Sequence, residues 1–256
     1  MSFGVTISVD VDGEAGLPGG GAGESLTARS ERRYGLGRGL ERLLAALDEV
    51  GAEGTFYVPG VVAAAHPDVV IAILDAGHEI GHHGHEHLHP DAIDEARQRA
   101  ELERGIEALA EVTGRAPAGY RAPGWALSDT TLALLAELAF AWDSSLMQDD
   151  RPYRIETASG PLWELPVQWT LDDAAWLAHP SDPQGMLAVW AAEIACARRE
   201  ERHLTVTLHS EVSGLGHRTD AIRRLLGDLA DDGTVLASHR MLFAEQLRGG
   251  RRGGRA

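Results

Sequence analysis

The sequence has a single cysteine, Cys196, in the segment AAEIACARRE. One cysteine cannot form a disulfide within the chain, and its helical setting favours a small buried side chain over a catalytic thiol. Positive charge is also scarce, because 23 Lys and Arg face 39 Asp and Glu and the net charge is −16. Nucleic acids and anionic lipids bind clustered cations, so this balance argues against a nucleic-acid partner and against a membrane partner.

Long apolar runs are missing as well. No stretch approaches the roughly 18 consecutive apolar residues of a membrane span, and the start MSFGVTISVD lacks the pattern of a secretory signal. We therefore expect a cytoplasmic protein. The apolar fraction of 44% still allows a substantial core, and 256 residues fit one α/β barrel of about 250 residues. We expect one domain over residues 1–248 and a flexible Gly/Arg-rich tail over residues 249–256.

Short apolar runs alternate with helical patterns along the chain. VTISVDVD alternates apolar and polar residues, which indicates a strand with one polar face. Further candidate strands are GTFYV, HEIGH, AGYRAP, FAWDSS, WELPV, HLTVTLH and TVLAS. Helices are expected over residues 40–50, 68–77, 91–114 and 184–201, over residues 219–230, and from Ser128 onward. About eight strands with interleaved helices predict a parallel β/α architecture, and this count suits a closed barrel better than an open sheet.

A glycine-rich segment, residues 13–23, follows the first strand. A phosphate-binding loop would run directly into a helix, whereas this segment contains Pro18 and meets its helix many residues later. We therefore interpret it as a flexible rim of an active site.

Polar residues stand at the carboxyl ends of the candidate strands, where β/α barrels carry their chemistry. We expect these residues to point into one mouth: Asp10, Asp12, His83, Arg121, Asp143 and His209. Asp10 and Asp12 share a strand face, and two carboxylates so close need a cation beside them. His83 and His87 would share a face if the chain makes one helical turn there, and two imidazoles with one carboxylate would leave metal positions open for water and substrate.

Simpler explanations exist for each of these residues. The aspartates could cap a turn, Arg121 could form a surface salt bridge, and His209 could be a core histidine. Other histidines of the same stretch could pair instead: His82, His85 and His89. We expect most of the remaining histidines to be structural, namely His66, His179, His203, His217 and His239, with His217 also a candidate substrate contact because it lies just past a strand.

Several segments together resemble one family, the polysaccharide deacetylases. SVDVDGE, GHEIGHHGHEH, GYRAPGW and LTVTLHSEVSGLGHR resemble its aspartate, metal-binding histidine, arginine and final histidine motifs, in the family's order. FAWDSSLMQDDRPY and LPVQWTLDD are similar to segments of the branch that holds cytoplasmic peptidoglycan deacetylase-like proteins, allantoinases and cyclic-imide hydrolases. The resemblance runs from about Val5 to Arg218. It implies an α/β fold, a distorted β/α barrel, often assembled into tetramers in this branch.

The resemblance also implies a role for individual residues. Asp12, His83 and His87 would bind a divalent metal, taken as Zn²⁺. Asp10 would be the general base and His209 the general acid, while Arg121 would hold Asp10. Four more residues would support the site or contact the substrate: Asp143, Trp125, Glu14 and His217. The sequence departs from the family at His85, His89 and Ser210, where relatives often have an aromatic residue, an acidic residue and a proline.

We therefore expect a metal-dependent hydrolase of amide bonds other than peptide bonds, acting on a small or soluble N-acetylated sugar. An alternative is an amidohydrolase of cyclic imides or ureides, similar to allantoinases. A more distant alternative is a non-haem iron enzyme, since two histidines and one carboxylate also form that site. The resemblance further implies a homo-oligomer, with a tetramer as the expected state.

Overall fold

The computed structural model describes residues 3–177 and 182–253, and it contains one nine-stranded sheet within them. The strand order is β6-β7-β5-β4-β3-β2-β1-β8, and β9 pairs with β1. The strands are β1 (Gly4–Asp10), β2 (Thr55–Val58), β3 (Glu79–His82), β4 (Gly119–Tyr120), β5 (Trp142–Asp143), β6 (Tyr153–Thr157), β7 (Gly160–Glu164), β8 (Leu204–His209) and β9 (Val235–Ala237).

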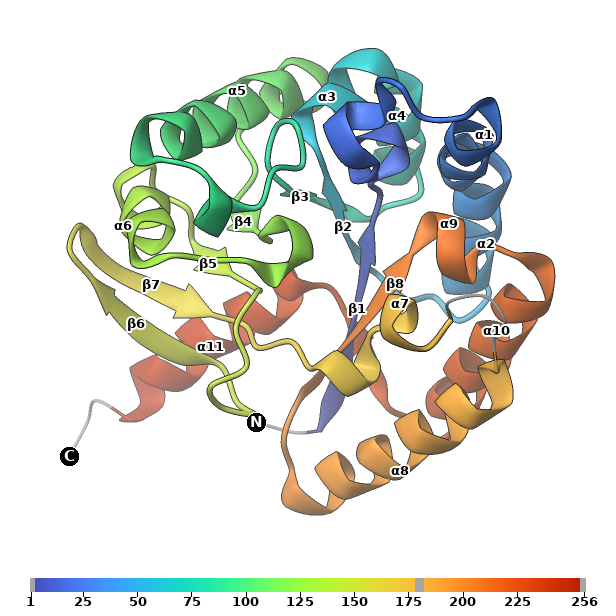
Figure 1. The fold of residues 1–256 in the computed structure, drawn as a ribbon. Coiled ribbons are helices and arrows are strands. Elements are labelled where there is room, and N and C mark those ends of the chain that lie inside the picture. The colour runs from blue at the N-terminus through green and yellow to red at the C-terminus, as the bar shows by residue number, and fades with distance from the viewer. Residues whose placement is uncertain (1–2, 178–181, 254–256) are drawn as a thin grey trace.

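The described helices lie mostly in an outer ring around these strands (Figure 1). They are α1 (Leu26–Tyr34), α2 (Leu40–Asp48), α3 (Gly60–Ala65), α4 (Pro67–Asp75), α5 (Glu95–Thr113), α6 (Asp129–Glu137), α7 (Asp173–Trp176), α8 (Pro183–Glu200), α9 (Ser210–Ser213), α10 (Gly216–Asp231) and α11 (His239–Gly253). None of the described helices is long and apolar enough to cross a membrane.

The sheet closes into a distorted barrel. Every strand pair is parallel except the β6–β7 hairpin. In the part of the chain that the structure describes, one isolated bridge between Asp172 and Thr207 links β8 to the segment that follows β7. The predicted fold class, a distorted β/α barrel, is confirmed.

The alternation of β1 explains how the barrel interior becomes polar. Val5, Ile7 and Val9 belong to the main apolar core, together with residues of α2 and α10. The intervening residues Thr6 and Ser8 are equally buried but hydrogen-bond to other polar groups inside the barrel. Both faces of β1 are therefore buried, and the polar face provides partners for the groups at the barrel mouth.

Local capping sets the helix boundaries. The long helix α5 starts at Glu95, later than predicted, because Pro90–Ala92 forms a single 3₁₀ turn and the Asp94 side chain accepts a hydrogen bond from Arg97 N (2.8 Å). The helix ends at Thr113 and is capped by Gly114, whose φ of 75° is the left-handed conformation that glycine adopts easily.

Four expectations from the sequence need correction. The glycine-rich segment contains two 3₁₀ turns, Gly13–Gly16 and Pro18–Gly21, and is followed closely by α1, which the pattern did not predict. Strand β6 was missed because it forms an antiparallel hairpin outside the β/α repeat. Helix α11 extends to Gly253, into the segment that was expected to be a loose tail, and residues 254–256 lie outside the described residues. Cys196 is partly exposed rather than buried.

Candidate metal centre and active site

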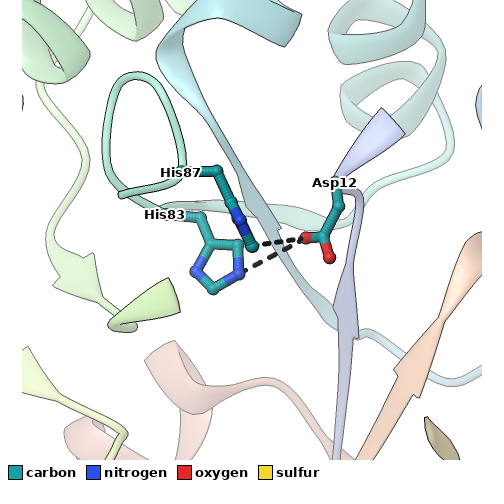
Figure 2. A group of neighbouring side chains, drawn as sticks. All are labelled: Asp12, His83 and His87. Atoms are coloured by element: carbon teal, nitrogen blue, oxygen red, sulfur yellow. Dashed lines mark ion pairs between the residues drawn. The ribbon is translucent and has the colours of Figure 1, made fainter. Parts of the chain in front are cut away.

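Three side chains predicted to bind a metal meet at the end of β1. The Nε2 atoms of His83 and His87 lie 3.4 Å and 3.5 Å from Asp12 Oδ1. Figure 2 shows both imidazoles turned toward this carboxylate. One nitrogen or oxygen atom from each of the three residues lies within 4.8 Å of the others. The cluster therefore has the size and the donor set of a site for one cation.

The loop after β3 brings the two histidines together without the predicted helical turn. Gly84 has a φ of 71° and His87 has a φ of 59°, so the chain bends back through two left-handed residues. Glu101 of α5 stabilises this bend, because its Oε2 accepts hydrogen bonds from the backbone N–H groups of His85 (3.0 Å) and Glu86 (2.7 Å). We call residues 83–89 the histidine loop.

A hydrogen bond fixes the orientation of the His83 ring. Its Nδ1 lies 2.8 Å from the carbonyl oxygen of Arg121, to which Nδ1 must donate a proton. In the neutral ring, Nε2 then presents a lone pair to Asp12 Oδ1, which is itself buried and has no hydrogen-bond partner. Two facing acceptors repel each other unless a cation or a proton lies between them. This arrangement fits a divalent metal, with the Arg121 carbonyl fixing the histidine tautomer.

The charges of the cluster act on one another. Burial would raise the pKa of the Asp12 carboxyl, but His87 and His83 outweigh it and hold this pKa well below its usual value. Burial would likewise lower the pKa of His83, but Asp10 and Asp12 raise it. The pocket thus favours positive charge beside an ionised Asp12, as a cation site requires.

Arg121 holds the second aspartate of β1. Its Nη1 donates to Asp10 Oδ1 (2.9 Å) and to Ser8 Oγ (2.8 Å), and its Nε donates to the carbonyl oxygen of Ser144 (3.0 Å). The guanidinium also lies 4.4 Å above the centre of the Tyr57 ring. Asp10 Oδ2 is left facing His83 Nε2 at 3.8 Å and His209 Nε2 at 3.9 Å.

Asp173 orients His209 on the opposite side of Asp10. Its Oδ1 lies 2.7 Å from His209 Nδ1, and its Oδ2 accepts hydrogen bonds from His209 N (2.9 Å) and Ser213 Oγ (2.5 Å). Burial alone would lower the pKa of His209, but Asp173 reverses this effect and raises the pKa well above its usual value. Asp173 therefore favours the protonated form of His209, whose Nε2 lies toward Asp10.

A cleft of 420 Å³ connects these groups. The indoles of Trp125 and Trp169 contact each other in its wall, with ring centres 4.5 Å apart. Arg32 of α1 also lines the cleft and forms an ion pair with Glu211, whose pKa is raised to about 7 by burial and by Asp12. The cleft thus combines aromatic walls with charged groups at its base.

Not every candidate residue reaches this cleft. Asp143 is fully buried behind it and accepts a hydrogen bond from Ser145 Oγ (2.8 Å). Glu14 pairs with Arg33 (3.1 Å) and lines a neighbouring cavity of 760 Å³. His217 is exposed at the start of α10 and lines neither cavity.

The other histidines of β3 and of the histidine loop have different surroundings. His82 is buried between Leu102 O and Gly84 N, and burial lowers its pKa to about 3, so it is a neutral core residue. His85 is buried next to α3, while His89 lines both the cleft and the neighbouring cavity. Of the remaining histidines, His66 lines that cavity, His203 and His239 are buried, and His179 lies outside the described residues.

Sequence reasoning gave no role to several residues that shape the site. Asp172, Asp173 and Trp169 lie in the segment LPVQWTLDD, whose similarity to the family was a signal that could have indicated them. Glu101 and Arg32 lie on helices with ordinary charged surfaces, and no pattern in the sequence distinguishes them from their neighbours.

The sequence and the fold are similar to those of known proteins. A family model described as polysaccharide deacetylase matches residues 34–141. A crystal structure of a Mycobacterium smegmatis protein assigned to the polysaccharide deacetylases is 36% identical, covers 98% of this chain and 91% of that chain, and superposes with a TM-score of 0.91. The chain therefore belongs to the polysaccharide deacetylase family.

Two further known proteins are similar to this chain. The peptidoglycan deacetylase of Helicobacter pylori is 33% identical over 175 residues, which are 68% of this chain and 59% of that protein. The chain spans less than two thirds of the length of this curated relative. The crystal structure of Puue allantoinase is 21% identical and covers 95% of this chain and 89% of its own, with a TM-score of 0.84, and it shares the fold.

Proposed function

We propose that the protein is a metal-dependent hydrolase that removes acetyl groups from N-acetylated sugars. The observation that carries the proposal is the convergence of three sets of groups on one cleft. The first set is the cluster of Asp12, His83 and His87. The second is Asp10 with its ion-pair partner Arg121, and the third is His209 with its partner Asp173. The name of the Helicobacter pylori relative supports an acetylated sugar as the substrate.

Asp12, His83 and His87 would hold the metal, and two histidines with one carboxylate suit Zn²⁺. A divalent ion bound there supplies Lewis-acid chemistry, which polarises an amide carbonyl and activates water. Within the chain, His83 Nδ1 is fixed by the Arg121 carbonyl, so its Nε2 stays available as a ligand. Burial of the carboxylate between two imidazoles excludes competing hydrogen-bond donors from Asp12 Oδ1.

Asp10 and His209 would act as base and acid. Arg121 occupies Asp10 Oδ1, so Oδ2 is the atom that takes a proton from the attacking water. Asp173 favours the protonated form of His209, which would donate its Nε2 proton to the departing nitrogen, because an amine leaves poorly until it is protonated. Each of these two transfers contributes about 10²–10⁴-fold to the rate.

A second candidate is hydrolysis of a cyclic imide or ureide by the same groups. The cleft volume of 420 Å³ favours it, since this volume suits a small molecule better than a polymer. A tetrameric state and a cytoplasmic location stay predictions from the resemblance. Size-exclusion chromatography with light scattering tests the first of them.

The decisive experiment measures metal content and activity together. Purified protein is analysed for bound metal and assayed for acetate release from N-acetylglucosamine oligomers and for ring opening of small imides and ureides, with Asp12→Asn as the matched variant. We expect about one metal ion per chain, activity on one substrate class, and loss of both in the variant. Full activity after chelation would refute the metal-dependent proposal, and dependence on O₂ would support the non-haem iron alternative instead.

A further inference from the structure

A buried histidine outside the cleft connects the last helix to the site. His239 is the first residue of α11 (red in Figure 1), is fully buried, and its backbone N–H donates to Thr55 Oγ1 (2.8 Å). Its ring Nδ1 lies 3.1 Å from the Tyr57 hydroxyl, and its Nε2 lies 3.2 Å from Ser144 Oγ and 3.4 Å from Thr205 Oγ1. Polar groups thus surround the ring although it does not line the cleft.

The surrounding hydrogen bonds define where the proton of this ring lies. Ser144 Oγ donates its only proton to the carbonyl oxygen of Leu165 (2.7 Å) and accepts a hydrogen bond from Arg121 Nη2 (3.1 Å). His239 Nε2 must therefore carry the proton, and Nδ1 accepts a hydrogen bond from the Tyr57 hydroxyl. Burial and the nearby Arg121 lower the pKa of His239 well below its usual value, so the ring is neutral, as this arrangement requires.

Ser144 and Tyr57 also hold Arg121, in addition to its hydrogen bonds to Asp10 and Ser8. Ser144 accepts hydrogen bonds from the guanidinium through its hydroxyl and through its carbonyl oxygen, and the Tyr57 ring lies beneath it. The guanidinium is planar and rigid, so a shift at its Ser144 side also moves Nη1, which contacts Asp10 Oδ1. Two paths therefore lead from His239 to the Asp10 carboxylate.

We infer that His239 is a positioning residue for Asp10, acting through Ser144, Tyr57 and Arg121. It fixes the directions of the two hydroxyl groups, which in turn set the plane of the guanidinium and the aim of Asp10 Oδ2. The inference rests on the proposed hydrolase function, in which Asp10 accepts a proton. In this inference His239, at the start of α11, affects catalysis through the position of Asp10 and does not contact the substrate.

The test compares His239→Gln with His203→Gln in the full, metal-loaded chain. His203 is a matched control, because it is buried inside the same barrel and, among the described residues, hydrogen-bonds to Thr6 and not to Ser144 or Tyr57. We expect His239→Gln to lower kcat about 10- to 100-fold, since misplacement by about 1 Å can cost that much. KM and metal content should stay unchanged. His203→Gln should lower the Tm and leave kcat within about twofold.

A double-mutant cycle separates positioning from general destabilisation. Ser144→Ala removes the hydroxyl that joins His239 to Arg121, so His239→Gln should cost much less in that background. Additive losses, or a wild-type kcat in His239→Gln, would overturn the inference. If His239→Gln does not fold, Ser144→Ala and Tyr57→Phe test the same links, and unchanged kcat in both overturns it. If the wild-type chain hydrolyses no amide, both the proposed function and the inference are refuted. If the wild-type chain is active and His239→Gln has the same kcat, only the inference is refuted.

Discussion

Replacing Asp173 by Asn tests the acid side of the site. The two oxygens of Asp173 accept three hydrogen bonds, from the ring and the backbone of His209 and from Ser213. Asparagine has one oxygen, so it cannot accept hydrogen bonds both from the His209 ring and from the His209 backbone and Ser213. If that oxygen keeps the backbone N–H and the Ser213 hydroxyl, the NH₂ group faces Nδ1 and holds the imidazole as the neutral tautomer with its proton on Nε2.

A neutral imidazole is a very weak acid, so the departing amine would not be protonated. We expect kcat to fall by about 10²–10⁴-fold, or about 3–5 kcal/mol at roughly 1.36 kcal/mol per tenfold. The pH dependence should change as well. In the wild type the pKa of His209 is raised, so the protonated form persists through neutral pH and activity falls only as the pH rises through that value. In Asp173→Asn the alkaline loss of activity should begin at lower pH.

The measurement is a pH–rate profile of kcat across the neutral and alkaline range. Asp172→Asn is the matched control, because this neighbouring carboxylate caps α7 through Ala174 N (2.7 Å) and raises the pKa of His209 without a hydrogen bond to it. Asparagine also caps helices, so the control should shift the profile in the same direction by a smaller amount. An unshifted profile in Asp173→Asn, or a larger shift in the control, would contradict the assigned acid.

Three further predictions concern the histidine loop and the stability of the fold. Glu101→Ala removes the acceptor for two N–H groups of the histidine loop and should weaken metal affinity about 10- to 100-fold, measured by metal titration. Glu103 is exposed on the same helix, and Glu103→Ala should leave the metal affinity unchanged. Gly105→Ala would place a Cβ 2.1 Å from His82 Nε2 and should cost about 1–3 kcal/mol in urea unfolding, with an unchanged urea midpoint as the contrary result. Burial lowers the pKa of His203 from 6.5 to about 4. As the pH falls from 6.5 to about 4, the unfolded chain therefore binds a proton at this residue and the folded chain does not. The free energy of unfolding should drop by about 1.4 kcal/mol for each pH unit over this range. His203→Gln should flatten that slope.

Much of the fold and of the candidate site could be predicted from two signals. These are the spacing of apolar residues along the chain and the rule that β/α barrels carry their chemistry at the carboxyl ends of the strands. The alternation around Ser8 and Asp10 identified a strand whose polar face turns inward. The rule that parallel strands end at one mouth was enough to expect Asp12 and His83 to meet, although they are far apart in sequence. Helix spacing and glycine stops located the larger helices to within a few residues.

What the sequence could not supply depends on tertiary structure. His87 reaches Asp12 through a left-handed bend that no periodicity encodes, and Glu101 stabilises it from a helix that packs nearby. Asp173 becomes the partner of His209 only when the barrel closes through the bridge at Asp172, which is a long-range event. The β6–β7 hairpin escaped notice because it breaks the β/α alternation on which the prediction relied.

The position of β1 in the sheet has a consequence for how the protein moves. This strand bonds to three neighbours, β2, β8 and β9, whereas β6 at the far edge has a single neighbour. Backbone amides in such a centre open to solvent only when the whole fold does, while edge hairpins open locally. Asp10, the proposed base, ends this strand, and Asp12, a proposed metal ligand, follows it by two residues. Changes in the β6–β7 hairpin at the far edge should therefore leave the positions of these two carboxylates unchanged.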